Sequence, residues 1–138
     1  MKKRYMIAGA YGLAGAALAA KLWSRPRDAD WSEHSARLPH AERSRFAEVD
    51  GVRVHYQDAG DEAAPAVVLI HGFCASALVW SDVLVPIAEM GFRVVAPDLA
   101  GFGFSGKPKR GEYTIDWQAH MVARLMDVLR IDRAALVG

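Results

Sequence analysis

Residues 67–73 read Val-Val-Leu-Ile-His-Gly-Phe, and residues 94–106 read Val-Val-Ala-Pro-Asp-Leu-Ala-Gly-Phe-Gly-Phe-Ser-Gly. Each stretch begins with a short apolar run that passes into polar and glycine residues. A wholly apolar run of this length is typical of a strand buried on both faces, as in a parallel sheet. The sequence therefore predicts buried parallel strands at residues 67–70 and 94–96, each followed by a turn that glycine permits.

Helical patterns follow these two strands. Residues 81–90 are predicted as a short helix that Gly91 ends. Pro86 conflicts with a helix interior, and we place it near the first turn of this helix. Thr114 is a candidate cap for a longer helix, because apolar residues follow it at helical spacing. These residues are Met121, Val122, Leu125 and Leu129.

A hairpin and a last strand complete the pattern. Residues 46–49 and 52–57 alternate apolar and polar residues on either side of Asp50-Gly51, a dipeptide that tolerates the positive φ angles of a tight hairpin. Residues 134–137 form another apolar run. The predicted order is a β-hairpin, then βα, βα and β, which defines an α/β fold.

The start of the chain has the composition of a membrane-inserting segment. Residues 5–20 carry no charge, follow three basic residues, and lead into Lys21-Leu22-Trp23. As a helix, residues 5–23 would extend roughly 28 Å, enough to span the hydrocarbon core of a bilayer. We expect residues 1–23 to be a transmembrane anchor. The alternative is a cleaved signal peptide, because Ala17-Leu18-Ala19 is a small-x-small run.

Three further expectations concern the region around this anchor. The basic residues before it, with the terminal amine, slightly outweigh those after it, which favours a bacterial inner-membrane protein with its domain outside the cytoplasm. Small residues at positions 8, 12, 16 and 20 form a stripe through which anchor helices would self-associate. Residues 24–44 are expected to be a polar tether, and residues 45–138 the domain.

Composition excludes some classes of protein. The 138 residues are 52% hydrophobic and 24% charged, as in an ordinary globular domain. Because 17 basic and 16 acidic residues are scattered along the chain, its formal net charge is +1, and no basic patch is available for nucleic acid. Cys74 is the one cysteine, so an intrachain disulfide is excluded.

Taken together, the motifs resemble those of the α/β-hydrolase family: strand, His-Gly-Phe, helix, strand, Asp-x-x-Gly-x-Gly-x-Ser, helix, strand, Gly. The resemblance covers residues 46–138. In that family the last of these strands leads into a Gly-x-Ser-x-Gly nucleophile elbow, and Gly138 matches its first glycine. The resemblance places the nucleophile two residues beyond Gly138, with the acid and histidine of the triad further on. Residues 1–138 alone are therefore expected to be inactive.

The resemblance also implies an oxyanion hole at the exit of the first buried strand. The family draws one N–H from the residue after His-Gly, which is Phe73 in this chain. His71 and Gly72 are implied as supporting residues of this loop, with His71 structural rather than catalytic. The implied reaction is serine-type hydrolysis of a small ester-like or activated carbonyl substrate, without cofactor or metal.

Two alternatives stay open within the same fold. Epoxide hydrolases and haloalkane dehalogenases of this family use an aspartate in the elbow. They usually have proline at the position of Cys74, and dehalogenases favour a polar residue at the position of Phe73, so both departures favour a serine hydrolase. The other alternative is a non-catalytic, membrane-anchored relative that acts as an interaction module.

Three other features invite different chemistry. Cys74 lies near His71 and could suggest a thiol nucleophile or half a metal site, but we expect a small buried thiol because no base or further ligand accompanies it. Asp98 is expected to accept main-chain N–H groups from the glycine turns that follow it. Residues 101–106 spell Gly-x-Gly-x-x-Gly, but Lys107-Pro108 does not open a helix. We set aside a P-loop and keep a dinucleotide-binding oxidoreductase only as an alternative.

Overall fold

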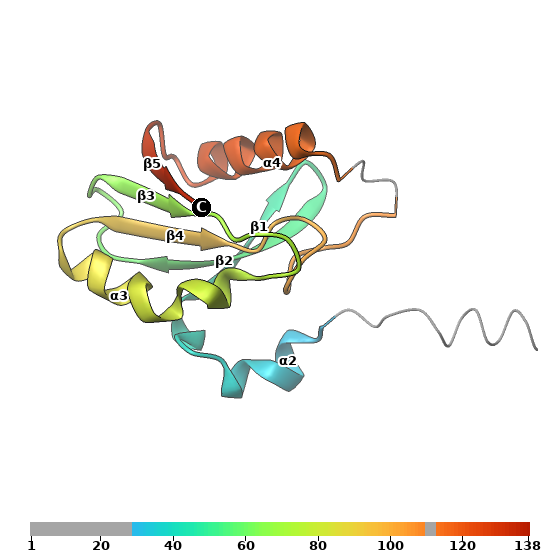
Figure 1. Ribbon diagram of the computed structural model, residues 1–138, viewed down its shortest axis with the longest axis horizontal. Helices are drawn as coiled ribbons and strands as arrows, with labels where there is room; N and C mark the ends of the chain where they lie inside the picture. Colours follow the sequence, from blue (N-terminus) through green and yellow to red (C-terminus); the bar gives the residue numbers. More distant parts are fainter. Residues whose placement is uncertain (1–28, 110–112) are drawn as a thin grey trace, which may run out of the picture.

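The computed structural model describes residues 29–109 and 113–138 (Figure 1). It contains a five-stranded mixed sheet with the strand order β1-β2-β4-β3-β5. The strands are β1 (Ser44–Val49), β2 (Val52–Ala59), β3 (Ala66–Leu69), β4 (Arg93–Pro97) and β5 (Ala134–Val137). The α-helices are α2 (Trp31–His34), α3 (Ser81–Glu89) and α4 (Ile115–Val128), and the 3₁₀ turns are η1 (Ser35–Arg37), η2 (Ala41–Arg43) and η3 (Ala77–Trp80). The predicted hairpin followed by βα, βα and β is confirmed.

The hairpin turn forms at the dipeptide that the sequence indicates. Asp50 and Gly51 have φ angles of 48° and 78°, as a tight two-residue turn with two left-handed residues requires. This turn pairs Val49 with Val52, so that β1 and β2 run antiparallel. Both valines are buried, and the hairpin therefore contributes one face to the core.

The order in which successive strands are added to the sheet reverses at β3. The connection from β3 to β4 adds a parallel neighbour on one side of β3, and the connection from β4 returns to add β5 in parallel on its other side. Because the two crossovers lead in opposite directions, α3 and α4 lie on opposite faces of the sheet (Figure 1). The result is a three-layer arrangement around parallel central strands.

The core consists of two apolar layers, one on each face of the sheet. Successive side chains of the central strands point alternately into one layer and the other. Val67 and Leu69 on β3 pack toward α3, whereas Val68 between them packs toward α4. Leu84 of α3 is fully buried in the first layer, and truncation to alanine there would cost about 2–5 kcal/mol. Met121 of α4 is buried in the second layer. The sheet is thus sandwiched between helices along its centre.

The two longer helices end and begin at the predicted signals. Gly91 follows α3 with φ 93°, and its N–H donates to the carbonyl of Ala88 at 3.0 Å. The side chain of Thr114 accepts the N–H of Trp117 at 3.2 Å and caps α4. The placement of Pro86 near the first turn is wrong, because α3 begins at Ser81 and Pro86 falls in the second turn. Since proline has no N–H, the hydrogen bond that this position would donate to the carbonyl of Asp82 is absent.

The segment before β1 packs on the domain. From Trp31 onward it forms α2, η1 and η2, whereas the sequence suggests a polar tether over residues 24–44. The Trp31 ring lies 5.6 Å from Phe46, 5.4 Å from His55 and 5.3 Å from Phe104, measured between centroids. The side-chain amide of Gln57 also donates to the carbonyl of Pro39 at 2.8 Å. The partners in these contacts are distant in the chain, so the composition of residues 24–44 alone does not indicate them.

No helix within the described ranges is long and apolar enough to cross a bilayer. The anchor expected at residues 5–23, with its self-association, lies outside the described residues. It stays a prediction.

An ion pair fixes the start of β4. The Arg93 guanidinium donates to both carboxylate oxygens of Asp58 at the end of β2, over 2.8 and 3.3 Å. Its third contact is with the carbonyl of Leu129 after α4, at 3.2 Å. Arg93 is buried, and the hydrogen bonds that it donates to Asp58 raise the pKa of its guanidinium. The pair therefore joins β2, β4 and α4 at one end of the sheet.

Candidate active site

The strand order itself locates a candidate site. In open α/β sheets, ligands bind beyond the carboxyl ends of the strands, at the point where the strand order reverses. That point is the shared end of β3 and β5, where Leu69 pairs with Val137 and the N–H of Ile70 donates to the carbonyl of Val137 at 2.7 Å. The His71-Gly72-Phe73 loop and Gly138 follow these two strand ends directly. The fold therefore brings the two predicted motifs to one edge of the sheet.

Phe73 lies at the tip of this loop. Its side chain is 89% exposed, and its ring makes an edge contact with Phe102 at 6.0 Å between centroids. Within the part of the chain that the structure describes, its main-chain N–H donates no hydrogen bond. An N–H of this kind, on a loop at a strand end, is available to bind a negatively charged oxygen.

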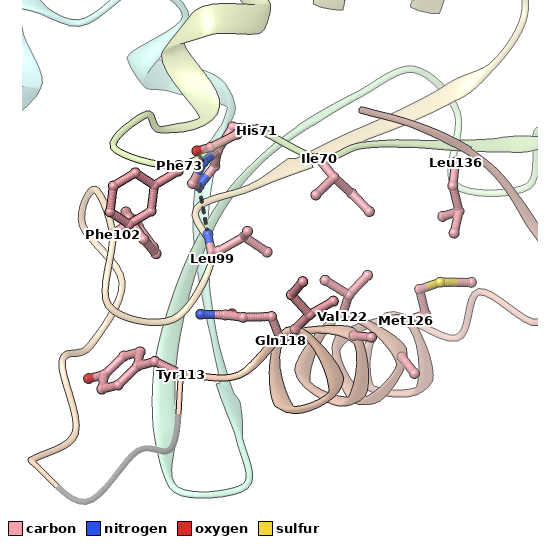
Figure 2. A pocket seen from close by; sticks show the side chains of 14 residues that line it. Ile70, His71, Phe73, Leu99, Phe102, Tyr113, Gln118, Val122, Met126 and Leu136 are labelled. Atoms are coloured by element: carbon pink, nitrogen blue, oxygen red, sulfur yellow. Dashed lines mark hydrogen bonds between the residues drawn. The ribbon is translucent and has the colours of Figure 1, made fainter.

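His71 connects two main-chain segments (Figure 2). The N–H of Leu99 donates to Nε2 of His71 at 2.9 Å, so this nitrogen is the acceptor. The proton of the neutral ring is then on Nδ1, which donates to the carbonyl of Gly72 at 2.8 Å. Both ring nitrogens are engaged and the side chain is buried. His71 consequently holds the loop to the exit of β4, and its geometry does not suit a general base.

The expectation of a buried thiol at Cys74 is wrong. Cys74 is exposed, and its φ of 57° lies in the left-handed region. The loop turns outward at this residue, because the N–H of Ala75 closes back on the carbonyl of Gly72 at 3.3 Å. The cysteine side chain is thereby directed away from the core.

Asp98 is buried just after β4 and binds groups from three segments. As predicted, its carboxylate accepts an N–H from the glycine turn that follows, that of Phe104 at 2.8 Å. It also accepts the N–H of Ala77 at 2.6 Å and the Nδ1–H of His55 at 2.8 Å. Burial alone would raise the pKa of Asp98, but these hydrogen bonds outweigh it and hold the pKa below its ordinary value. The last two partners were not predicted, and no local sequence signal indicates them.

A serine, a histidine and an aspartate meet in this buried cluster without forming a catalytic triad. Ser105 Oγ donates to the main-chain carbonyl of Asp98 at 2.7 Å and accepts the main-chain N–H of His55 at 2.9 Å. The His55 ring binds the Asp98 carboxylate instead of the hydroxyl. Because a triad needs the imidazole to contact the hydroxyl, this cluster is structural.

The glycine-rich stretch folds as a closed loop. The N–H of Gly101 donates to the carbonyl of Gly106 at 2.9 Å, and the N–H of Gly106 donates to the carbonyl of Arg53 at 2.8 Å. A Cβ atom on Gly103, whose φ is 49°, would overlap the Asp98 carboxylate. Among the described residues after this loop, the next helix begins at Ile115, so these glycines do not place phosphate-binding N–H groups at its N-terminus.

A cavity of about 460 Å³ opens beside the loop, between the sheet and α4 (Figure 2). Ile70 and Leu136 line it from the sheet, and Val122 and Met126 line it from α4. Phe73 is at its end nearest the strand exits. The lining is mostly apolar, as is usual for pockets that bind small organic molecules.

Comparison with known proteins gives the same family. The model of the alpha/beta hydrolase fold matches residues 65–138. Epoxide hydrolase A of Mycobacterium tuberculosis is 35% identical over 99 residues, which are 71% of this chain and 31% of that protein. The 2-hydroxy-6-oxo-2,4-heptadienoate hydrolase of Pseudomonas putida is 35% identical over 102 residues, which are 72% of this chain and 36% of that protein.

Solved structures agree with this match. A crystal structure described as a membrane phospholipase A and bacterial virulence factor superposes with a TM-score of 0.69 at 30% identity, covering 97% of this chain and 43% of that one. The chain spans about a third of the length of the two curated relatives. Since the matched region includes the His-Gly-Phe loop, the closed glycine loop and the strand end at Gly138, the chain belongs to the α/β-hydrolase fold family.

Proposed function

We propose that the complete protein is a serine-type hydrolase of a small ester-like or activated carbonyl substrate. The observation that carries this proposal is the uncommitted N–H of Phe73, on the loop beside the end of β5. In acyl transfer the carbonyl oxygen becomes an oxyanion, and N–H groups fixed where that charge develops lower the barrier. Phe73 would supply one such group.

The rest of the reaction follows the Ser-His-acid scheme. A serine two residues beyond Gly138 would attack the substrate carbonyl, and a histidine would take its proton and pass it to the leaving alcohol. Water, deprotonated by the same histidine, would then release the acid and restore the serine. The second N–H of the oxyanion hole would come from the residue after the serine.

Gly138 fits the start of such an elbow. A Cβ atom at this position would lie 3.2 Å from the carbonyl oxygen of Ile70, tighter than most contacts of that kind. Glycine therefore allows β5 and the exit of β3 to stay close at the point where the nucleophile turn would begin. This closeness would bring a nucleophile near the N–H of Phe73.

The surroundings of the loop support an uncharged substrate. Leu99, Phe102 and Tyr113 line the cavity beside Phe73, so a substrate there would face mainly apolar side chains. Because the cavity wall is mostly apolar, a charged group bound there would lack a partner, and burying an unpaired charge is costly. Ester-like carbonyl compounds satisfy this requirement.

A second candidate is an aspartate-nucleophile enzyme acting on epoxides or alkyl halides. The similarity to epoxide hydrolase A favours it. Cys74, where such enzymes usually have proline, argues against it. Turnover of p-nitrophenyl acetate but not of styrene oxide would support the serine hydrolase, and the reverse would support this candidate. Turnover of neither would favour the non-catalytic interaction module.

We further propose that residues 5–23 hold the protein in a membrane. The uncharged segment of the sequence supports this, as does the similarity to a protein described as a membrane phospholipase A. Sidedness follows the charge difference across the segment, which favours a domain outside the cytoplasm.

Substitution at Phe73 tests the catalytic proposal in the complete protein. Phe73→Pro removes the N–H, and we expect kcat for p-nitrophenyl acetate to fall about 10²–10³-fold. Phe73→Leu keeps the N–H and should lose far less activity. Thermal melts of both variants show whether they are equally folded. Equal losses in two equally folded variants would mean that the main-chain donor is not used.

A further inference from the structure

We propose that Asp98 is a positioning residue for the oxyanion loop, joining that loop to the exit of β4. This inference rests on the proposed function, because it concerns the placement of the Phe73 N–H. Asp98 lies outside the cavity and is itself only 1% exposed, so it acts on the loop through its hydrogen bonds.

Two hydrogen bonds join the loop to the exit of β4, one at each end of the loop. At its start, Nε2 of His71 accepts the N–H of Leu99 at 2.9 Å. At its end, the N–H of Ala77 donates to Oδ1 of Asp98 at 2.6 Å. Between them, Phe73 and Cys74 are exposed and have little packing to hold them. Neighbouring residues at the exit of β4 therefore set where the loop begins and ends.

The carboxylate is well suited to this task because its other oxygen is also fixed. Oδ2 accepts the N–H of Phe104 at 2.8 Å and the Nδ1–H of His55 at 2.8 Å. Three donors from separate segments thus hold the carboxylate in one orientation. The carboxylate also fills the space that a side chain at Gly103 would need. A hydrogen bond to a fixed carboxylate constrains the position of its donor more strictly than one to a mobile surface group.

Position matters at this loop because catalysis by an N–H donor depends on distance. Misplacing a group by about 1 Å can cost about 10²-fold in rate. Asp98→Asn leaves one side of the group with an NH₂, which cannot accept an N–H. In one orientation of the amide the N–H of Ala77 loses its acceptor. In the other, the N–H of Phe104 and the Nδ1–H of His55 lose theirs. We expect kcat of the complete protein for p-nitrophenyl acetate to fall about 10–100-fold per folded molecule, with KM changed less than about twofold.

Asp58→Asn is the matched control. It makes the same chemical change in a carboxylate with a hydrogen-bonded partner, Arg93, at the opposite end of β4. It should lower stability without changing kcat per folded molecule. Equal falls of kcat in Asp58→Asn and Asp98→Asn would overturn the proposal, because general destabilisation would then explain both. An unchanged kcat in Asp98→Asn would overturn it as well.

A probe on Cys74 gives a readout that does not depend on activity. This residue is exposed within the loop, and a trifluoromethyl label on its thiol reports loop conformation by fluorine NMR. We expect the signal to shift or broaden in Asp98→Asn and to stay unchanged in Asp58→Asn. An unchanged signal in Asp98→Asn would overturn the positioning role. A different combination of results would separate the two proposals. If Phe73→Pro and Phe73→Leu were equally active while the signal still changed in Asp98→Asn, the proposed function would be rejected. The role of Asp98 in positioning the loop would then still stand.

Discussion

At the scale of single residues, the Asp98 carboxylate gives the fold a dependence on acid. Burial would raise its pKa, but the hydrogen bonds from His55, Ala77 and Phe104 outweigh burial and set the folded pKa below the ordinary value of 3.8. A group with a depressed pKa stabilises the fold above its unfolded pKa, and the stabilisation is lost as pH falls through the folded pKa. We therefore expect Asp98 to contribute near neutrality and to lose that contribution below pH 3.8.

Urea denaturation of the wild type and of Asp98→Asn over a range of pH measures this contribution. Leaving a buried donor without its acceptor costs about 1–3 kcal/mol, so the difference in unfolding free energy should be of that order near neutrality. It should shrink as the pH falls below 3.8 and through the lower pKa of the folded state. A difference that stays constant over this range would contradict the depressed pKa.

The same residues show what local sequence contains. The N–H of Phe104 comes from the turn after Asp98, so this contact could be predicted from turn chemistry. His55 and Ala77 lie 43 and 21 residues away, and only the assembled sheet brings them to the carboxylate. Cys74 shows the opposite difficulty: its residue type favours burial, but the left-handed turn of its own backbone exposes it.

At the scale of elements, α2 behaves as part of the domain. Trp31 contacts the rings of Phe46, His55 and Phe104, and each aromatic contact of this kind contributes about 0.5–1.5 kcal/mol. We expect Trp31→Ala to lower the unfolding free energy by on the order of 2 kcal/mol, measured by urea denaturation. Trp31→Phe keeps an aromatic ring and should lose clearly less. Equal stability of Trp31→Ala and the wild type would mean that α2 is not docked in solution.

Elements with their own local signals were predictable, and α2 was not. The hairpin has its Asp50-Gly51 turn, and α4 has a Thr114 cap followed by apolar residues at helical spacing. The strand β3 is a continuous apolar run, and β4 is one after its first residue, Arg93. The segment of α2, η1 and η2 is too short for a periodic pattern, and its position depends on rings supplied by β1, β2 and the glycine loop.

At the scale of the whole molecule, the proposed anchor predicts how the complete protein partitions. Residues 5–23 are long and apolar enough to span, so we expect the protein to stay in the membrane pellet after alkaline carbonate extraction. Deletion of residues 1–23 should move it to the supernatant. N-terminal sequencing of the mature protein checks the signal-peptide alternative, because a terminus at Ala20 would mean that the segment is removed. Release of the intact protein by carbonate would contradict a spanning anchor.

The reversal of strand order at β3 also has a consequence for synthesis on the ribosome. β3 ends at Leu69, but its second neighbour, β5, begins only at Ala134. At about 5–20 residues per second, the ribosome needs on the order of several seconds to deliver the missing strand. During that interval the apolar strand Ala66–Leu69 has an open edge, which attracts other strands. The order of strands that places the candidate site thus also sets an interval in which this strand of the nascent chain is unpaired on one side.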